Sequence, residues 1–389
     1  MIKMLCNQPI HWVEDKKTLD DLCTRWRACK ILAVDTEFMR SQTYYPIAAL
    51  LQVNDGEANY LIDPTVIQDC SAFGEMLTDI NIVKILHSCS EDLDVFQHLL
   101  GVIPVKLFDT QIAAALCGYG FSVGYGNLVK AVLDKDLPKS ETRSDWLQRP
   151  LSTAQIDYAA IDVEDLFQLA QVLILKLKNL DRLFWATDDC EQVLTAFGNN
   201  QGDANSYLRI KQAWRLSRKN LTILKALAQW REGCAKNRDV PRNRVIKEHS
   251  LMDIASAAPS HISQLRAFEG LTDRMIRTDG ENLITVVQAA LEQDVESYPA
   301  LIEKPLTSSE NKWAKKMRAC VGVIAEEQNV APELLMKKRD YEAITRRFFQ
   351  QESDNLENIL EALKSHISGW RYDLLSEPLA QTICGEIEE

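Results

Sequence analysis

Five residues in the first half of the chain have the types and spacing of a site that could bind metal ions: Asp35, Glu37, Asp92, Tyr158 and Asp162. Asp35 and Glu37 end a short apolar run, and residues two apart on a strand project to the same face. Two neighbouring carboxylates at the end of a buried strand cost free energy unless a cation neutralises them. Oxygen-only ligands of this kind suit Mg²⁺ or Mn²⁺. The plainer alternative for the pair is a strand whose polar end reaches solvent.

The third carboxylate, Asp92, lies in the stretch SCSEDLDVF (88–96), where we expect a helix to begin near Ser90. On a helix Asp92 shares a face with Val95 and Phe96, so the pattern predicts that it points inward at the edge of an apolar stripe. An inward acid needs a partner. Capping of the helix start is the competing explanation.

Tyr158 and Asp162 are four residues apart on a long helix that we expect to start at 151. Ser152 and Gln155 have the spacing of a capping box at its start. Side chains four apart stack on one helix face, and Asp162 interrupts a small, apolar surface. A single tyrosine in such a position is more often a core residue with its hydroxyl at the rim. The case for a site therefore rests on the combination of the five residues.

The elements that must position these residues indicate an α/β fold. A polar helix is expected around 15–29, and helical periodicity continues almost without interruption from about 109. Asp55-Gly56 separates two apolar runs and predicts a hairpin, because glycine tolerates the positive φ of tight turns. A mixed sheet covered by helices follows from this order. The runs predicted as strands are ILAVDTE (31–37), AALLQV (48–53), ANYLID (58–63) and IVKILHS (82–88).

The chain of 389 residues is long enough for two or three domains. We expect a first domain over 1–200, followed by two all-α helical bundles over 207–293 and 300–385. AFGNNQGDANSY (196–207) is the best linker, and YPALIEKPLTSSE (298–310), with two prolines, divides the bundles. The two bundles could be divergent copies of one another.

The composition, with 46% hydrophobic and 26% charged residues, is typical of a soluble globular protein. No apolar run approaches the roughly 18–20 residues that span a bilayer, and the first residues lack the pattern of a secretory signal. The ten cysteines show no CxxC and no zinc spacing. We therefore expect a cytoplasmic protein with reduced thiols, no membrane partner and, by default, a monomeric state.

The net charge of −12 is unevenly distributed along the chain. Residues 1–200 hold 17 Lys/Arg and 28 Asp/Glu, a net of −11, whereas residues 207–250 hold 12 Lys/Arg and 3 Asp/Glu, a net of +9. An acidic half joined to a basic stretch fits a carboxylate metal site combined with a surface that binds phosphates. A solvated helical face is the alternative for the basic stretch.

The order of the motifs resembles the DEDD exonuclease superfamily, tyrosine subclass: DxE on a first strand, Asp early in a later helix, then Tyr-x-x-x-Asp. Longer stretches are similar to the ribonuclease D family in particular, and the resemblance covers essentially the whole chain. None of the five motif positions departs from the family pattern. These stretches are VDTEFMRSQTYYP (34–46), HSCSEDLDVF (87–96), LFDTQIAAAL (107–116) and KSETRSDWLQRPLSTAQIDYAAIDV (139–163).

The resemblance implies a ribonuclease H-like, DEDD-type nuclease domain followed by two HRDC-like domains. It also implies hydrolysis of RNA from the 3′ end with two divalent cations, Mg²⁺ or Mn²⁺, and no organic cofactor. In that scheme Asp35 bridges both ions, Glu37 and Asp162 hold the ion nearer the nucleophile, and Asp92 supports the other. Tyr158, whose unperturbed pKa is near 10, would orient the attacking water. The implied substrates are tRNA precursors and other small stable RNAs with single-stranded 3′ ends.

Further residues are candidates for substrate binding. Phe38, beside Glu37, could stack on the terminal base or pack in the core. Lys139, Arg143 and Arg149 flank the approach to the Tyr158 helix and could bind phosphates, although Arg149 could simply end one element before the next with its charge in solvent. The tryptophans of the basic stretch, Trp214 and Trp230, are expected in the core. Its candidates for RNA contact are Arg215, Arg218, Lys219, Arg242 and Arg244.

Two other functions are compatible with parts of this pattern. A DNA 3′→5′ exonuclease would use the same carboxylates, and no residue in the sequence distinguishes ribose from deoxyribose. An inactive nucleic-acid-binding scaffold is the alternative outside the enzymes. Its nuclease half would have no need of four carboxylates in one pocket, so the five intact motif positions argue against it.

Overall fold

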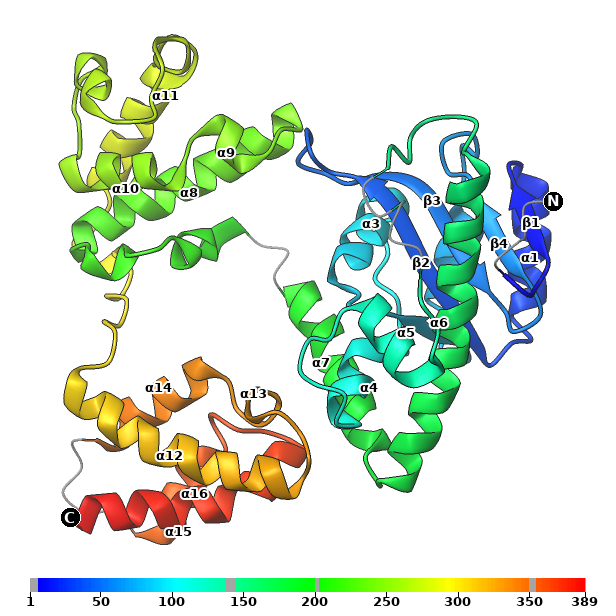
Figure 1. Ribbon diagram of the computed structural model, residues 1–389. Coiled ribbons are helices and arrows are strands. Elements are labelled where there is room, and N and C mark those ends of the chain that lie inside the picture. Colours follow the sequence, from blue (N-terminus) through cyan, green and yellow to red (C-terminus); the bar gives the residue numbers. More distant parts are fainter. Residues whose placement is uncertain (1–5, 138–140, 142–143, 200–202, 350–354, 389) are drawn as a thin grey trace. The chain divides into compact units, whose positions relative to one another are not determined.

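The computed structural model describes residues 6–137, 141, 144–199, 203–349 and 355–388 (Figure 1). The chain forms two compact units, each described here by itself. The first comprises Met1–Phe38, Ala48–Ala196 and Leu306–Glu389, and the second comprises Met39–Ile47 and Phe197–Pro305. The chain therefore passes between the units four times, twice around the short segment 39–47.

A six-stranded mixed sheet forms the centre of the first unit, in the order β1-β4-β3-β2-β5-β6. β2 runs parallel to β5 and β5 parallel to β6, whereas β3 and β4 are antiparallel. The four strands predicted from apolar runs are confirmed. The bounds are β1 Ile10–Val13, β2 Ile31–Met39, β3 Ile47–Asn54, β4 Asn59–Ile62, β5 Val83–Leu86 and β6 Leu107–Asp109.

The two strands that the sequence did not predict, β1 and β6, are four and three residues long. Such short segments show no measurable alternation of apolar and polar residues. The predicted hairpin between β3 and β4 is confirmed. Gly56 adopts a φ of +93°, and the Asp55 carboxylate accepts hydrogen bonds from the backbone N–H groups of Glu57 and Ala58. A tight turn of this kind sets the register of the two strands.

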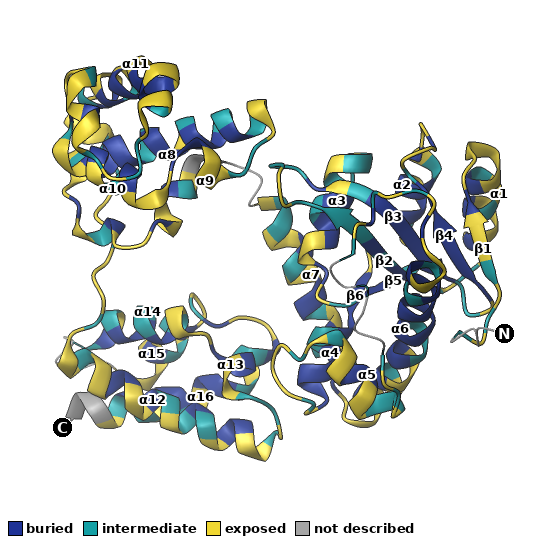
Figure 2. Ribbon diagram, turned by 45° about the horizontal axis from the view of Figure 1, so that its top comes forward, coloured by how far each residue is buried: buried dark blue, intermediate teal, exposed yellow. Residues whose placement is uncertain are grey.

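Seven helices surround the sheet in the described part of residues 6–199, and the 27-residue α6 is the longest of them. The predicted capping box of Ser152 and Gln155 is present at its start. In Figure 2 the buried residues concentrate on the sheet and on α6. The helices are α1 Lys16–Trp26, α2 Ser71–Leu77, α3 Ser90–Leu100, α4 Thr110–Leu116, α5 Tyr125–Leu133, α6 Thr153–Asn179 and α7 Leu183–Asn199.

The C-terminal helices also belong to the first unit and pack on α7. Trp370 stacks on Trp185 with ring centroids 4.2 Å apart. Arg371 donates to both carboxylate oxygens of Asp189, at 2.5 and 2.8 Å. A large aromatic contact beside a bidentate ion pair fixes this packing. The helices are α12 Ser308–Glu327, α13 Pro332–Leu335, α14 Lys338–Phe348, α15 Leu356–Leu363 and α16 Trp370–Glu388.

The second unit is a helical bundle joined by segment 39–47. Its helices follow the same order of lengths as the C-terminal bundle: a long helix, a single turn, a helix of about three turns, a short helix and a second long helix. No helix in the described residues is long and apolar enough to cross a membrane. The main elements are α8 Arg218–Arg238, α9 Arg242–Val245, α10 Glu248–Ala257, η3 Ile262–Ala267 and α11 Asp273–Leu291; η1 Asp203–Arg209, η2 Ala213–Arg215 and η4 Val295–Ser297 are short 3₁₀ turns.

Candidate active site

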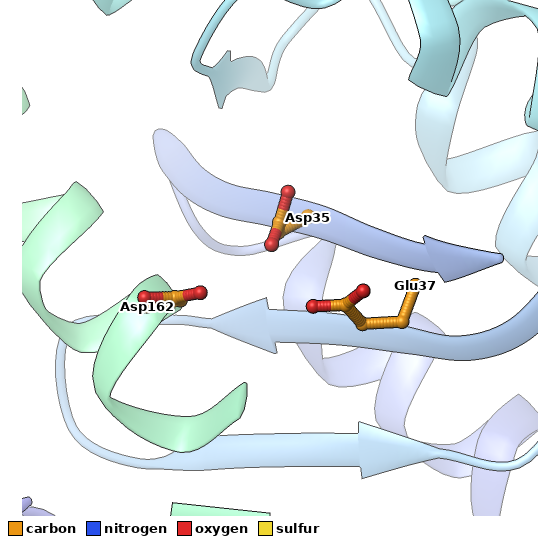
Figure 3. A group of neighbouring side chains, drawn as sticks. All are labelled: Asp35, Glu37 and Asp162. Carbon is orange, nitrogen blue, oxygen red and sulfur yellow. The ribbon is translucent and has the colours of Figure 1, made fainter. Parts of the chain in front are cut away.

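Three carboxylates from two elements converge at one place in the first unit. Asp35 and Glu37 project from the same face of β2, and Asp162 reaches toward them from α6 (Figure 3). One carboxylate oxygen of each lies within 4.8 Å of the others. The alternation of side chains along β2 brings Asp35 and Glu37 together, as the sequence predicts. Asp162 lies more than 120 positions further along the chain, and the packing of α6 brings it to the other two.

Asp92 lies beside this group, near the start of α3. Its side chain is 7% exposed, so the prediction that it points inward is confirmed. Its Oδ1 accepts a hydrogen bond of 2.6 Å from the hydroxyl of Thr36, the residue between the two β2 carboxylates. The charge of Asp35 raises the pKa of Asp92 further, beyond the increase that burial causes. Asp92 therefore belongs to the same electrostatic cluster.

Burial raises the pKa of every carboxyl in the cluster, and the neighbouring acids add to the effect. The pKa of Asp162 rises to about 7, and those of Asp35 and Glu37 rise further. Within the described ranges no lysine, arginine or histidine forms an ion pair with any of the four acids. Four ionised carboxylates without a cation cost several kcal/mol of free energy, on the order of that for any buried unpaired charge.

The donor set fits a divalent metal ion. All four groups offer oxygen, the ligand preferred by Mg²⁺ and Mn²⁺. Asp162 Oδ1 is buried and has no hydrogen-bond partner among the described residues. A buried acceptor left without a donor is uncommon and calls for a partner. A bound cation would satisfy this oxygen and neutralise the cluster.

Without metal, the free energy of unfolding should fall as the pH rises from about 4 to about 8. Unfolded carboxyls release their protons near pH 4. The folded cluster keeps them to higher pH, because burial and then Asp162 raise the pKa of Asp35 to about 8. The folded state thus binds more protons across this range, so raising the pH favours unfolding. Urea midpoints in EDTA should decline with pH, and decline less for Asp35→Asn. Parallel curves for the two proteins would contradict the raised pKa.

Tyr158 lies on α6, one turn before Asp162. Burial raises its pKa well above 10, and the carboxylates of Asp162 and Glu37 raise it further. Interaction with the Tyr158 hydroxyl in turn lowers the pKa of Asp162. The ring lies 5.9 Å from that of Trp146 and packs against a small apolar cluster. Tyr158 therefore remains protonated at neutral pH and can act as a hydrogen-bond donor or acceptor, but not as a base.

Three residues that support the site were not identified from the sequence. Thr36 binds Asp92, and the Tyr125 hydroxyl donates a 2.5 Å hydrogen bond to the main-chain oxygen of Asp162. The buried Asp109 carboxylate accepts from the backbone N–H groups of Ser88 and Cys89, immediately before α3. Each acts through a contact between distant segments, for which a single sequence carries no periodic signal.

The candidate substrate-binding residues of the first unit have different surroundings. Phe38 is half-buried at the end of β2. Lys139 and Arg143 lie outside the described residues. Arg149 donates to both carboxylate oxygens of Asp63, at 2.5 and 2.8 Å. This arginine therefore holds the chain before α6 in place, and the expectation that its charge lies in solvent is wrong, because Asp63 pairs with it.

The basic candidates of the second unit divide into two groups. Arg215 and Lys219 are exposed, and Arg215 lies over the ring of Trp214. The others have partners within the unit. Arg218 donates to the main-chain oxygens of Tyr298 and Pro299, Arg242 pairs with Glu232, and Arg244 donates to Gln42. Of the tryptophans, Trp230 packs against the core of the bundle, as expected.

Comparisons with known proteins agree with this architecture. The sequence model of a 3′-5′ exonuclease domain matches residues 10–178, and that of the HRDC domain matches residues 220–287. Ribonuclease D of Pseudomonas paraeruginosa is 39% identical over 374 residues, which cover 96% of this chain and 97% of that protein. Ribonuclease D of Escherichia coli is 35% identical over 363 residues, with 93% and 95% covered.

A solved structure extends the similarity to three dimensions. The crystal structure of Escherichia coli RNase D, described as an exoribonuclease involved in structured RNA processing, matches with a TM-score of 0.85 at 32% identity. The match covers 97% of this chain and 99% of that one. The fold, the carboxylate cluster and the matched domains thus define a 3′→5′ exonuclease that carries an HRDC domain. Within that class the chain belongs to the ribonuclease D family, and it is a 3′→5′ exoribonuclease.

Proposed function

We propose that the chain removes nucleotides from RNA 3′ ends by hydrolysis at Asp35, Glu37, Asp92, Tyr158 and Asp162, releasing nucleoside 5′-monophosphates. The observation that carries the proposal is the convergence of three carboxylates within 4.8 Å, in a buried cluster with which no lysine, arginine or histidine of the described residues forms an ion pair. When bound there, two Mg²⁺ or Mn²⁺ ions would stabilise the charge of the scissile phosphate and lower the pKa of water.

The four acids would hold these ions, and their positions suggest a division of labour. One oxygen of Asp35 lies within 4.8 Å of an oxygen of Asp162 and of Glu37, and the charge of Asp35 also raises the pKa of Asp92. These interactions are compatible with the bridging role that the family implies for Asp35. Glu37 and Asp162 would serve the side nearer the attacking water, and Asp92, fixed by the hydroxyl of Thr36, the other side.

Tyr158 would orient the attacking water. Its high pKa keeps the hydroxyl protonated, and the Asp162 carboxylate can only accept that proton in a hydrogen bond. The oxygen lone pairs of Tyr158 then remain available to accept a hydrogen bond from water. Attack forms the new O–P bond as the bond from phosphorus to the 3′ oxygen breaks. The water proton passes to solvent, and the leaving 3′ oxygen is protonated.

RNA binding outside the catalytic site is proposed for the basic stretch and for residues near the cluster. Arg215 and Lys219 carry this proposal best, because both are exposed and, among the described residues, neither has a hydrogen-bond or ion-pair partner of its side chain. Contacts of exposed cations with phosphates would account for affinity without sequence preference. Weaker candidates, because of their internal partners or their surroundings, are Phe38, Arg218, Arg242 and Arg244. Lys139 and Arg143, which lie outside the described residues, stay candidates from the sequence alone.

The finer assignments follow from the family and from particular features of the chain. tRNA precursors and other small stable RNAs are the proposed substrates, in keeping with the structured RNA processing ascribed to the Escherichia coli relative. The ten free cysteines favour the reducing cytoplasm. A monomer suffices, because one chain carries all the proposed catalytic groups.

The proposed domain boundaries are 1–200 for the nuclease, 207–293 for the first HRDC-like domain and 300–385 for the second. The HRDC-like nature of the second bundle is supported by its helix order, which repeats that of α8 to α11. A Val-Pro or Val-Ala-Pro step leads into the single-turn helix of each bundle, with Pro241 just before α9 and Pro332 as the first residue of α13. Such agreement in five successive elements favours divergent copies of one fold.

Matched RNA and DNA oligonucleotides test the proposed function. Each is labelled at its 5′ end and incubated with the protein in Mg²⁺, in Mn²⁺ or in EDTA. We expect stepwise shortening of the RNA from its 3′ end, release of 5′-monophosphates, and complete arrest in EDTA. Shortening that survives EDTA would exclude the metal mechanism, and a preference for DNA would exclude the assigned substrate.

A further inference from the structure

Segment 39–47, which joins β2 to β3, belongs to the second unit, whereas the catalytic residues of β2 belong to the first. Glu37 lies two residues before Met39, where the chain enters the second unit. The conformation of segment 39–47 can therefore act on the end of the catalytic strand through the covalent chain. This makes the contacts of the segment within its own unit relevant to catalysis.

Two tyrosines of the segment are held by the α8–α9 region of the bundle. The backbone N–H groups of Tyr44 and Tyr45 both donate to Oδ1 of Asp239, each at 3.0 Å. Asp239 caps the C-terminal end of α8 with a left-handed φ of +47°. A charged acceptor that receives two backbone N–H groups forms stronger hydrogen bonds than a neutral one. Two successive residues of the segment are thus fixed at the backbone, independently of their side chains.

The Tyr44 side chain is held as well. Its hydroxyl donates to Oε1 of Glu232, a residue of α8 that is 3% exposed, and accepts from Arg242 at 3.0 Å. Arg242 also donates to both oxygens of Glu232, and its guanidinium lies 4.8 Å from the centre of the Tyr44 ring. Burial alone would raise the pKa of Glu232, but Arg242 and then Tyr44 lower it overall. Glu232 therefore stays charged and bound to both.

We infer that Tyr44, Tyr45, Glu232, Asp239 and Arg242 form a positioning anchor, through which the HRDC domain holds the end of the catalytic strand β2. The inference rests on the proposed function, because it concerns the placement of Glu37. Without the anchor, Phe38 and the residues after it would sample more conformations. Glu37 would then spend less time in the arrangement that catalysis needs. The HRDC domain thus acts on turnover as well as on RNA affinity.

Asp239→Gly tests the anchor in the full-length protein. Glycine adopts positive φ without strain, so the cap of α8 is preserved while the carboxylate is lost. Asp239→Asn is the conservative partner, because its Oδ1 still accepts from both N–H groups. Asp134→Gly is the matched control, since Asp134 is an exposed aspartate with φ +54° that caps α5. A double Arg215→Ala, Lys219→Ala variant serves as the comparison for RNA binding.

For Asp239→Gly we expect kcat on an RNA oligonucleotide to fall about 3- to 10-fold, with KM within about twofold of the parent. Asp239→Asn and Asp134→Gly should match the parent, and the double variant should raise KM alone. Hydrogen exchange followed by mass spectrometry should show faster exchange in the peptide spanning 36–47 of Asp239→Gly. Tyr44→Phe, which keeps the ring, should give a smaller loss of the same kind.

Three outcomes would overturn the anchor. They are unchanged kcat in both Asp239→Gly and Tyr44→Phe, a change in KM alone, and faster hydrogen exchange that is confined to residues after 39 and does not reach Glu37. If the parent protein itself fails to digest RNA, the proposed function fails. The exchange measurement still reports on the anchor in that case, so the two failures are distinguishable.

Discussion

Replacement of Asp35 by asparagine should reduce kcat for RNA hydrolysis on the order of 10³-fold or more. Asparagine keeps the size of the side chain but removes its charge and one acceptor oxygen. Asp35 interacts electrostatically with both Asp162 and Asp92, as Glu37 does. Its neutralisation therefore weakens the binding of metal ions by the four carboxylates. Single-turnover rates measured with saturating enzyme separate this loss from any change in RNA binding.

Binding of RNA by Asp35→Asn should remain within about threefold of the parent, because the exposed basic residues Arg215 and Lys219 lie in the other unit. Glu91→Gln is the matched control. It neutralises an exposed acid next to Asp92 and should leave kcat unchanged. Turnover by Asp35→Asn near the parent rate would show that the site lies elsewhere. An equal loss in Glu91→Gln would point to general charge effects instead.

Replacement of Tyr158 by phenylalanine should lower kcat by about 10²-fold, the scale expected when a reacting group loses its orientation. The ring and its contact with Trp146 are retained, so the loss isolates the hydroxyl. Affinity for Mn²⁺ should change little, because the four carboxylates are intact. The rate of RNA hydrolysis gives kcat, and a calorimetric titration with Mn²⁺ on the same preparation gives the metal affinity.

Tyr372→Phe provides the control for Tyr158→Phe. The Tyr372 hydroxyl donates to the main-chain oxygen of Leu360 within the C-terminal bundle. Its removal should leave turnover unchanged. If Tyr158→Phe turns over as fast as Tyr372→Phe, the hydroxyl has no part in the reaction. A large loss of Mn²⁺ affinity in Tyr158→Phe would instead assign the tyrosine to the assembly of the site.

Much of the nuclease fold could be predicted because its signals are local. β2 opens with four successive apolar residues before Asp35 and Glu37, the Asp55-Gly56 turn uses the positive φ of glycine, and the start of α6 carries a capping box. Asp92 was predicted to face inward from helical spacing alone. For these features, one element contains the information that determines the structure.

The features that escaped prediction depend on contacts between distant segments. β1 and β6 are too short for periodicity and form only against the longer strands. Arg242 looked like a phosphate ligand because the sequence shows its charge but not Glu232 and Tyr44 beside it. The net charge of residues 207–250 therefore overstates the cations that RNA could reach. Several of these cations form hydrogen bonds or ion pairs inside the unit.

The central claim is that Asp35, Glu37, Asp92 and Asp162 bind the divalent cations that drive hydrolysis. Anomalous diffraction from crystals soaked in Mn²⁺ and a short RNA locates those ions directly. We expect two peaks roughly 3.5–4 Å apart, ligated by these four carboxylates, with the RNA 3′ end beside Tyr158. Mn²⁺ bound by other residues, or a bound RNA end with no ion among the four acids, would contradict it.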